Sequence, residues 1–148
     1  MKKIAFLLLF TTFLTSCQNK PMEKYEWIPT SSAPEIYPTR IHNGHFYLED
    51  GGQVYIPTSA SNNTGWGYSG SFHSQGEDLK ALPIKLDITW ASYLENKFYT
   101  GSWDMPIDTL KTLFKKGTIG WRTNRPSTYS LIVVGCAPGG VVVVWVYG

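Results

Sequence analysis

The chain has 148 residues, a length that indicates one domain, and 15% of them are aromatic. The formal net charge of +2 comes from Lys2 and Lys3, because without them 11 of the 13 Lys and Arg residues balance 11 Asp and Glu residues. A neutral chain without a clustered basic face excludes nucleic acid as a partner. Short segments separated by Gly and Pro favour a β-rich fold over a helical bundle.

The N-terminus has the pattern of a secretory signal. Lys2 and Lys3 precede a mostly apolar stretch, residues 4–14, which is shorter than the roughly 20 apolar residues that a membrane-spanning helix needs. The next residues, Leu14-Thr15-Ser16-Cys17, resemble the bacterial lipobox, whose small residues give the peptidase access to the backbone and whose cysteine thiol carries a diacylglyceryl group. We therefore expect a signal peptide over residues 1–16 and lipidation of Cys17.

The expected lipid determines where the protein works. Two or more acyl chains attach a protein stably to a membrane, whereas one chain does not. Position 18 is Gln, not the Asp that resembles an inner-membrane retention signal of enteric-type bacteria, so we expect the outer membrane of a bacterial envelope, facing the periplasm. Residues 17–24 would form a short tether that keeps a single β-rich domain, residues 25–148, within about 35 Å of its lipid.

The first part of the domain indicates short strands and turns. Residues 25–28 predict a strand, after which the three prolines between positions 29 and 38 should interrupt any regular ladder. The dipeptide Asn43-Gly44 predicts a hairpin turn, which would make His42 and His45 cross-strand neighbours. The two histidines could also be read as metal ligands, although a metal site needs three or four ligands.

The middle of the chain combines a strand, a glycine-rich segment and a strongly alternating strand. Residues 53–56 predict a strand, and residues 59–76 predict a long loop or an irregular edge hairpin. Residues 84–90 alternate strictly, so this strand should have one buried face and one wet face. The buried face would hold Ile84, Leu86, Ile88 and Trp90. Residues 97–103 predict its partner strand.

One helix is expected in the domain, roughly over residues 106–116. Asp104 has the character of an N-cap, Pro106 suits the first turn, and Gly117 suits the end. Between them, apolar residues recur at helical spacing, and the last turn holds two lysines that favour the negative end of the helix dipole.

The C-terminus predicts a long hairpin of residues 129–135 and 141–147 around a type II turn at Pro138-Gly139. Both segments are nearly all apolar, so other elements must pack on both of their faces, and we expect Val143 and Val144 to lie in a central strand.

The fold is therefore expected to be mainly β, a sandwich-like or curled antiparallel sheet with one helix packed on it. Cys136 is expected to pack in the core, because lipidation of Cys17 leaves it no disulfide partner.

Motifs of enzymes are incomplete in this sequence. The run 67–71 resembles a nucleophile elbow, but its fifth position is Ser71 where Gly is required. Two adjacent acid pairs, Glu49-Asp50 and Glu77-Asp78, could supply carboxylates for glycoside chemistry, but acids beside Gly more often form turns. The sequence indicates no cofactor and no metal.

The most informative segment for binding is the glycine-rich loop and the residues after it. Aromatic side chains exposed beside polar groups are typical of binding surfaces. Trp66 could instead fold back and cover one end of the β layer. The candidate partner-binding residues are Trp66, Tyr68, His73, Glu77 and Asp78.

Several short segments, in their order along the chain, resemble the uncharacterised bacterial lipoproteins grouped as domain of unknown function 2931. Besides the lipobox, they are residues 25–27, 55–57, 65–67, 76–83, 86–90, 95–99 and 137–140. The resemblance covers nearly all of the chain after the signal, and Cys136 stands where an aliphatic residue would be expected. It implies a small lipid-anchored envelope domain and no particular activity.

The sequence leaves three hypotheses for function. The first is a membrane-anchored module that binds a protein or another envelope ligand, for instance an immunity protein that inhibits a toxin in the periplasm. The second is an envelope hydrolase that acts on cell-wall glycan or lipid through His73, Glu77 or Asp78. The third is a structural component of the envelope.

Overall fold

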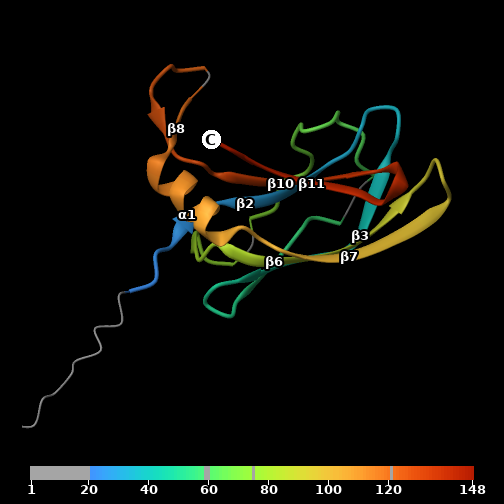
Figure 1. The fold of residues 1–148 in the computed structure, drawn as a ribbon. Coiled ribbons are helices and arrows are strands. Elements are labelled where there is room, and N and C mark those ends of the chain that lie inside the picture. The colour runs from blue at the N-terminus through green and yellow to red at the C-terminus, as the bar shows by residue number, and fades with distance from the viewer. Residues whose placement is uncertain (1–20, 59–60, 75, 121) are drawn as a thin grey trace, which may run out of the picture.

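The computed structural model describes residues 21–58, 61–74, 76–120 and 122–148. The expected signal peptide and Cys17 lie outside the described residues. Within them, two sheets pack face to face as the layers of a β-sandwich, and one helix lies at the end from which the N-terminal segment leaves (Figure 1). The prediction of a mainly β fold with one helix is confirmed. No helix in this part of the chain is long and apolar enough to cross a membrane.

The first layer is a four-stranded antiparallel sheet with strand order β4-β3-β6-β7. Its strands are β3 (Thr39–Leu48), β4 (Gln53–Tyr55), β6 (Pro83–Ser92) and β7 (Lys97–Asp104). The predicted alternation of β6 is confirmed for Leu86, Ile88 and Trp90, which are buried, whereas Ile84 is 40% exposed.

The second layer is a three-stranded sheet with strand order β11-β10-β2. Its strands are β2 (Ile28–Ser32), β10 (Leu131–Ala137) and β11 (Val141–Tyr147). The predicted C-terminal hairpin is confirmed, since β10 and β11 pair antiparallel without a break in register. Gly139 between them has φ 79° and ψ 11°, as the third residue of a type II turn requires.

Strand β11 lies at the edge of its sheet, so the prediction that Val143 and Val144 lie in a central strand is wrong. The central strand is β10, whose Ile132, Val133 and Val134 are fully buried. A continuous apolar run shows that a strand has no fully wet face, but it does not show how many neighbours the strand has.

Strand β2 runs parallel to β10 and continues through Pro29, so the expected interruption at this proline is also wrong. The reason is its position, since β2 is the other edge of the sheet. On an edge strand the missing N–H of a proline can face away from the ladder.

The predicted hairpin at Asn43-Gly44 is wrong as well. Strand β3 continues through both residues and has an irregularity in its register with β6 between Ile41 and Asn43. Gly44 is buried, and a Cβ there would lie 3.1 Å from the side chain of Ile56. Here the glycine therefore permits a close approach inside the sandwich and does not form a turn.

The predicted helix is confirmed as α1 (Ile107–Lys116), which buries Leu110 and Phe114. It ends at Gly117, whose φ is 69° and whose N–H donates to the Leu113 carbonyl over 2.8 Å. The expected N-cap is wrong, because Asp104 belongs to β7 and Pro106 occupies the cap position.

Four short strands complete the fold as two pairs, β1 (Tyr25–Glu26) with β5 (Leu79–Lys80) and β8 (Thr118–Ile119) with β9 (Pro126–Ser127).

The core lies between the two layers and includes Phe46 and Trp90 of one sheet and Ile132 and Val134 of the other. Cys136 is buried in the same cluster, and burial raises the pKa of its thiol to about 12. The expectation that Cys136 acts as a packing residue is therefore confirmed.

The end of the sandwich that holds the two hairpin turns is closed by hydrogen bonds. Glu95, in the turn between β6 and β7, accepts one from the N–H of Gly139 over 3.1 Å and one from the Tyr99 hydroxyl over 3.0 Å. Tyr99 also stacks on the buried ring of Trp90. The two layers are thus joined at this end, whereas α1 lies at the opposite end (Figure 1).

Candidate functional site

Trp66 lies on the outer face of the three-stranded sheet. Its indole contacts the ring of Trp145 in β11 and passes close to Gly135 in β10, where a Cβ would lie 3.1 Å from it. The loop is held in place by the Ser32 hydroxyl, which accepts from the N–H of Gly67 over 2.9 Å. Trp66 nevertheless stays 40% exposed. Trp66 therefore folds back on the β layer, as the sequence-based alternative has it, but it covers the outer face of the sheet and not one end of the layer.

The other four candidate residues are exposed. Tyr68 is 72% exposed and His73 lies on the same loop. Glu77 forms an ion pair with Lys24 over 3.5 Å. Among the described residues, no hydrogen bond, ion pair or ring contact joins the aromatic pair of this set to its three ionisable members, so the structure does not bring the set together as one site.

The two histidines lie on one strand, β3, and not across a hairpin. The ring of His42 packs against Phe98 and that of His45 against Tyr55, with centroids 6.1 and 4.5 Å apart. The part of the chain that the structure describes contains no group of three or more His, Cys, Asp or Glu residues able to hold a metal ion.

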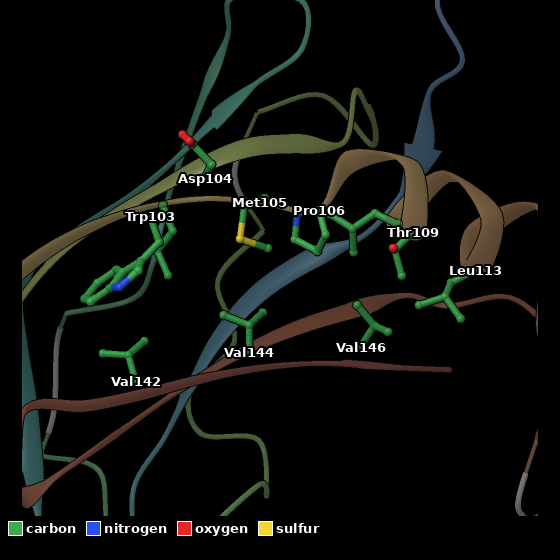
Figure 2. Close-up of a pocket in the computed structure, with 11 residues that line it drawn as sticks. Trp103, Asp104, Met105, Pro106, Thr109, Leu113, Val142, Val144 and Val146 are labelled. Carbon is green, nitrogen blue, oxygen red and sulfur yellow. The ribbon is translucent and has the colours of Figure 1, made fainter.

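A different region of the surface forms an apolar cleft of about 360 Å³. It lies where the edge strand β7 of one layer and the edge strand β11 of the other stand side by side, and we call it the β7–β11 cleft. Figure 2 shows Trp103 and Met105 on one side of it, facing Val142 and Val144 on the other. Pockets of about 300–1,000 Å³ with mostly apolar walls are typical of sites for small molecules and cofactors.

The helix end of the cleft is also apolar. Pro106, Thr109 and Leu113 come from α1 and the segment before it, and they lie opposite Val146 (Figure 2). Leu110 contributes a buried side chain beneath them. The helix therefore covers this end of the interlayer space without filling the gap between the two edge strands.

Trp103 is the largest side chain of the cleft and is 41% exposed. Its position depends on Gly101, because a Cβ at that residue would collide with the indole ring. The indole therefore lies flat along β7 and forms one wall. An exposed tryptophan held on a rigid strand is the kind of anchor in which binding energy concentrates.

The described lining of the cleft carries little charge. Among the residues that the structure describes, Asp104 is the only charged one in this lining, and Figure 2 shows its carboxylate pointing away from the valines of β11. The other lining side chains are apolar except for Thr109, so the cleft offers a mostly apolar surface to a ligand.

The sequence itself contains a signal for this cleft. The apolar run 141–146 predicts that other elements pack on both faces of this strand, but in the structure they cover these faces only in part. Val142, Val144 and Val146 remain partly exposed because, among the described residues, no strand lies beside β11 on its outer edge. An apolar edge strand that its own fold covers only partly is a candidate binding surface.

Comparison with known families gives one finding. The model of a family described as a protein of unknown function, DUF2931, matches residues 15–148. Neither the curated proteins nor the solved structures contain a match to the chain.

Proposed function

Because the chain belongs to the DUF2931 family of proteins of unknown function, we propose its function from its own geometry: it is a lipid-anchored envelope protein that binds a partner at the β7–β11 cleft. The observation that carries this proposal is the cleft itself, about 360 Å³ in volume, with apolar walls and Trp103 at its mouth. Exposed apolar surface that is gathered in one place is a common mark of an interaction site.

The membrane part of the proposal rests on the lipobox at residues 14–17. A diacylglyceryl group on Cys17 would place the domain at the membrane surface, most simply the periplasmic face of the outer membrane. A toxin that reaches the periplasm is one specific partner, in which case the protein would confer immunity. No contact among the described residues favours the hydrolase or the purely structural role over binding.

Photo-crosslinking in the native host tests where the protein binds. A benzophenone side chain is placed at Trp103, in the cleft, and in separate variants at Phe98 and Tyr68. Phe98 is a matched control because it lies on the same strand and is 69% exposed. We expect a defined crosslinked adduct from position 103 and none from position 98. An adduct from position 68 alone would show that the partner contacts the glycine-rich loop and not the cleft, which would contradict the proposal.

A further inference from the structure

We propose that the β7–β11 cleft binds an extended peptide segment of a partner protein, which adds to the three-stranded sheet as a strand beside β11. This inference rests on the proposed function and specifies the chemistry of the partner. It follows from the backbone of β11, from the side chains beside it and from the way in which the other sheet edges are protected.

Two of the four edges of the two layers are protected against strand addition, and a third, β7, carries a charge only at each end. Strand β2 carries Pro29 and is covered by the glycine-rich loop, where the N–H of Gly70 donates to the Ser31 carbonyl over 2.7 Å. Strand β4 has only 3 residues. Strand β7 begins at Lys97 and ends at Asp104. Proline, covering loops, short length and charge are the usual devices that block edge pairing.

Strand β11 has none of these devices. Its 7 residues contain no proline and no charge, and its pairing with β10 shows no bulge. Within the described residues it pairs with β10 alone. A long, regular, apolar edge strand exposes a template for another strand.

The direction of the unpaired backbone groups can be deduced from Tyr147. Its carbonyl accepts from the N–H of Ser130 over 2.7 Å, so the backbone of Tyr147 faces β10. Along a strand the N–H and C=O groups of successive residues alternate between the two sides. Those of Val142, Val144 and Val146 therefore point away from β10, toward the open edge.

The same three valines also point their side chains into the cleft (Figure 2). A strand placed beside β11 would thus form backbone hydrogen bonds with these residues and would place alternate side chains of its own between β11 and Trp103. This is the geometry of β-augmentation, in which backbone bonds supply affinity and alternate side chains supply specificity.

The backbone also distinguishes a peptide from an acyl chain. A fatty acid could fill the apolar space, but it would remove water from the open edge and leave the N–H and C=O groups of Val142, Val144 and Val146 without partners. Buried polar groups without partners are strongly disfavoured. A peptide strand fills the same space and satisfies these groups.

The charge of the cleft limits the sequence of the peptide. The inserted face of the strand should be uncharged, because the walls are apolar. Asp104 stands at the rim, is exposed and has no ion pair among the described residues. A basic residue next to the apolar segment would therefore complement the cleft.

The test uses the whole chain and a panel of synthetic seven-residue peptides that match the length of β11. Each has valine or isoleucine at alternate positions, threonine between them and one lysine at either end. Each also has a twin in which the backbone amides on one edge are N-methylated, which removes the donors but keeps the side chains. Palmitate is the acyl probe. Binding is followed through the amide N–H signals of Val142, Val144 and Val146 and the indole N–H of Trp103 in NMR spectra.

Substitutions at Val144 provide a second measurement. Val144→Pro removes an N–H that faces the open edge, and Val144→Thr keeps this N–H in a side chain of similar shape. We expect at least one peptide to bind and to slow hydrogen exchange at the three valine amides. Its N-methylated twin and the Val144→Pro protein should each bind at least tenfold more weakly, whereas Val144→Thr should bind within about twofold of the wild type. If Val144→Pro fails to fold, the twin peptides decide the question on the wild-type protein.

Other outcomes would overturn the inference in distinct ways. Equal binding of both twins would show that the cleft takes side chains without strand pairing, and the proposed function would stand. Binding of palmitate and no peptide would make the occupant an acyl chain. Dimerisation of the chain through Val144 would make the occupant a second copy. No binding by any probe, together with no crosslinked adduct at position 103, would contradict the proposed function itself.

Discussion

Trp66 packs edge-on against Trp145, with ring centroids 5.0 Å apart and an angle of 86° between the ring planes. The contact joins the glycine-rich loop to the outer face of β11, so this face is partly covered, whereas the opposite face of β11 borders the β7–β11 cleft. The two tryptophans are thus structural neighbours, and the exposed aromatic side chain with the better claim to bind a partner is Trp103.

The first prediction concerns Trp66 itself. An edge-to-face aromatic pair contributes about 0.5–1.5 kcal/mol beyond its buried area. Trp66→Ala should therefore lower the free energy of unfolding by about 1–2 kcal/mol and the melting temperature by roughly 3–8 °C. Tyr68→Ala is the control, because Tyr68 is 72% exposed and should change the melting temperature little. If the Trp66→Ala variant has the melting temperature of the wild type and binds its partner less well, Trp66 is a binding residue and not a packing residue.

The second prediction compares the central and the edge strand of the three-stranded sheet. Val134 is fully buried in β10, whereas Val144 is partly exposed in β11. Val134→Ala should cost about 2–3 kcal/mol of stability, and Val144→Ala about 1 kcal/mol, because less apolar surface and a smaller cavity are involved. Chemical denaturation of the two variants measures the difference. Equal costs would indicate that β11 is as buried as a central strand.

The third prediction concerns pH and the closed end of the sandwich. Burial would raise the pKa of the Glu95 carboxyl, but the neighbouring Ser92 hydroxyl, the N–H of Gly139 and the Tyr99 hydroxyl outweigh it and hold this pKa below the ordinary value of 4.5. A carboxyl whose pKa is lower in the folded chain stabilises the fold above its unfolded pKa and loses this effect as the pH falls through its folded pKa.

Glu95→Gln tests this contribution. At pH 7 the variant should melt below the wild type, and the gap between the two melting temperatures should shrink as the pH falls below about 4.5. Asp87, whose pKa is also lowered, is present in both proteins and does not affect the comparison. A gap that stays constant from pH 7 to pH 3 would show that the Glu95 charge does not help to close this end.

The fourth prediction concerns the anchor. Cys17→Ser removes the thiol that would receive the lipid, so the precursor should stay uncut and should not incorporate a fatty-acid analogue. Cell fractionation should then find the protein without its outer-membrane attachment. A Cys17→Ser protein that is still cleaved and still labelled would exclude the lipobox interpretation.

The sequence predicted elements whose signals are local. The alternation of β6, the helical spacing of α1 and the apolar hairpin of β10 and β11 all reflect short-range periodicity, and the structure confirms them. The hairpin predicted at Asn43-Gly44 is wrong, because a dipeptide that permits a turn also permits a tight contact, and only the position of Ile56 shows which applies. Local patterns do not contain that long-range information.

The proposed binding surface was harder to predict for a related reason. Trp66 stands among glycines and polar residues and looks exposed from its neighbours in sequence, but it packs on Trp145, which is far along the chain. Trp103 ends an ordinary strand pattern, and its exposure arises only because β7 and β11 lie side by side as unpaired edges. The sequence therefore pointed to aromatic residues of the glycine-rich loop, whereas the surface that we propose from the structure lies at Trp103.

The most direct test of the central claim, that the β7–β11 cleft is the binding surface, is the affinity of two matched variants for the partner crosslinked at position 103. Trp103→Ala removes the wall of the cleft, and Phe98→Ala removes an exposed aromatic ring from the outer face of the same strand. With folding confirmed by melting curves, Trp103→Ala should bind about 30-fold more weakly, a loss of about 2 kcal/mol, and Phe98→Ala should bind within about twofold of the wild type. Equal affinities for both variants, or a loss confined to Phe98→Ala, would contradict the account.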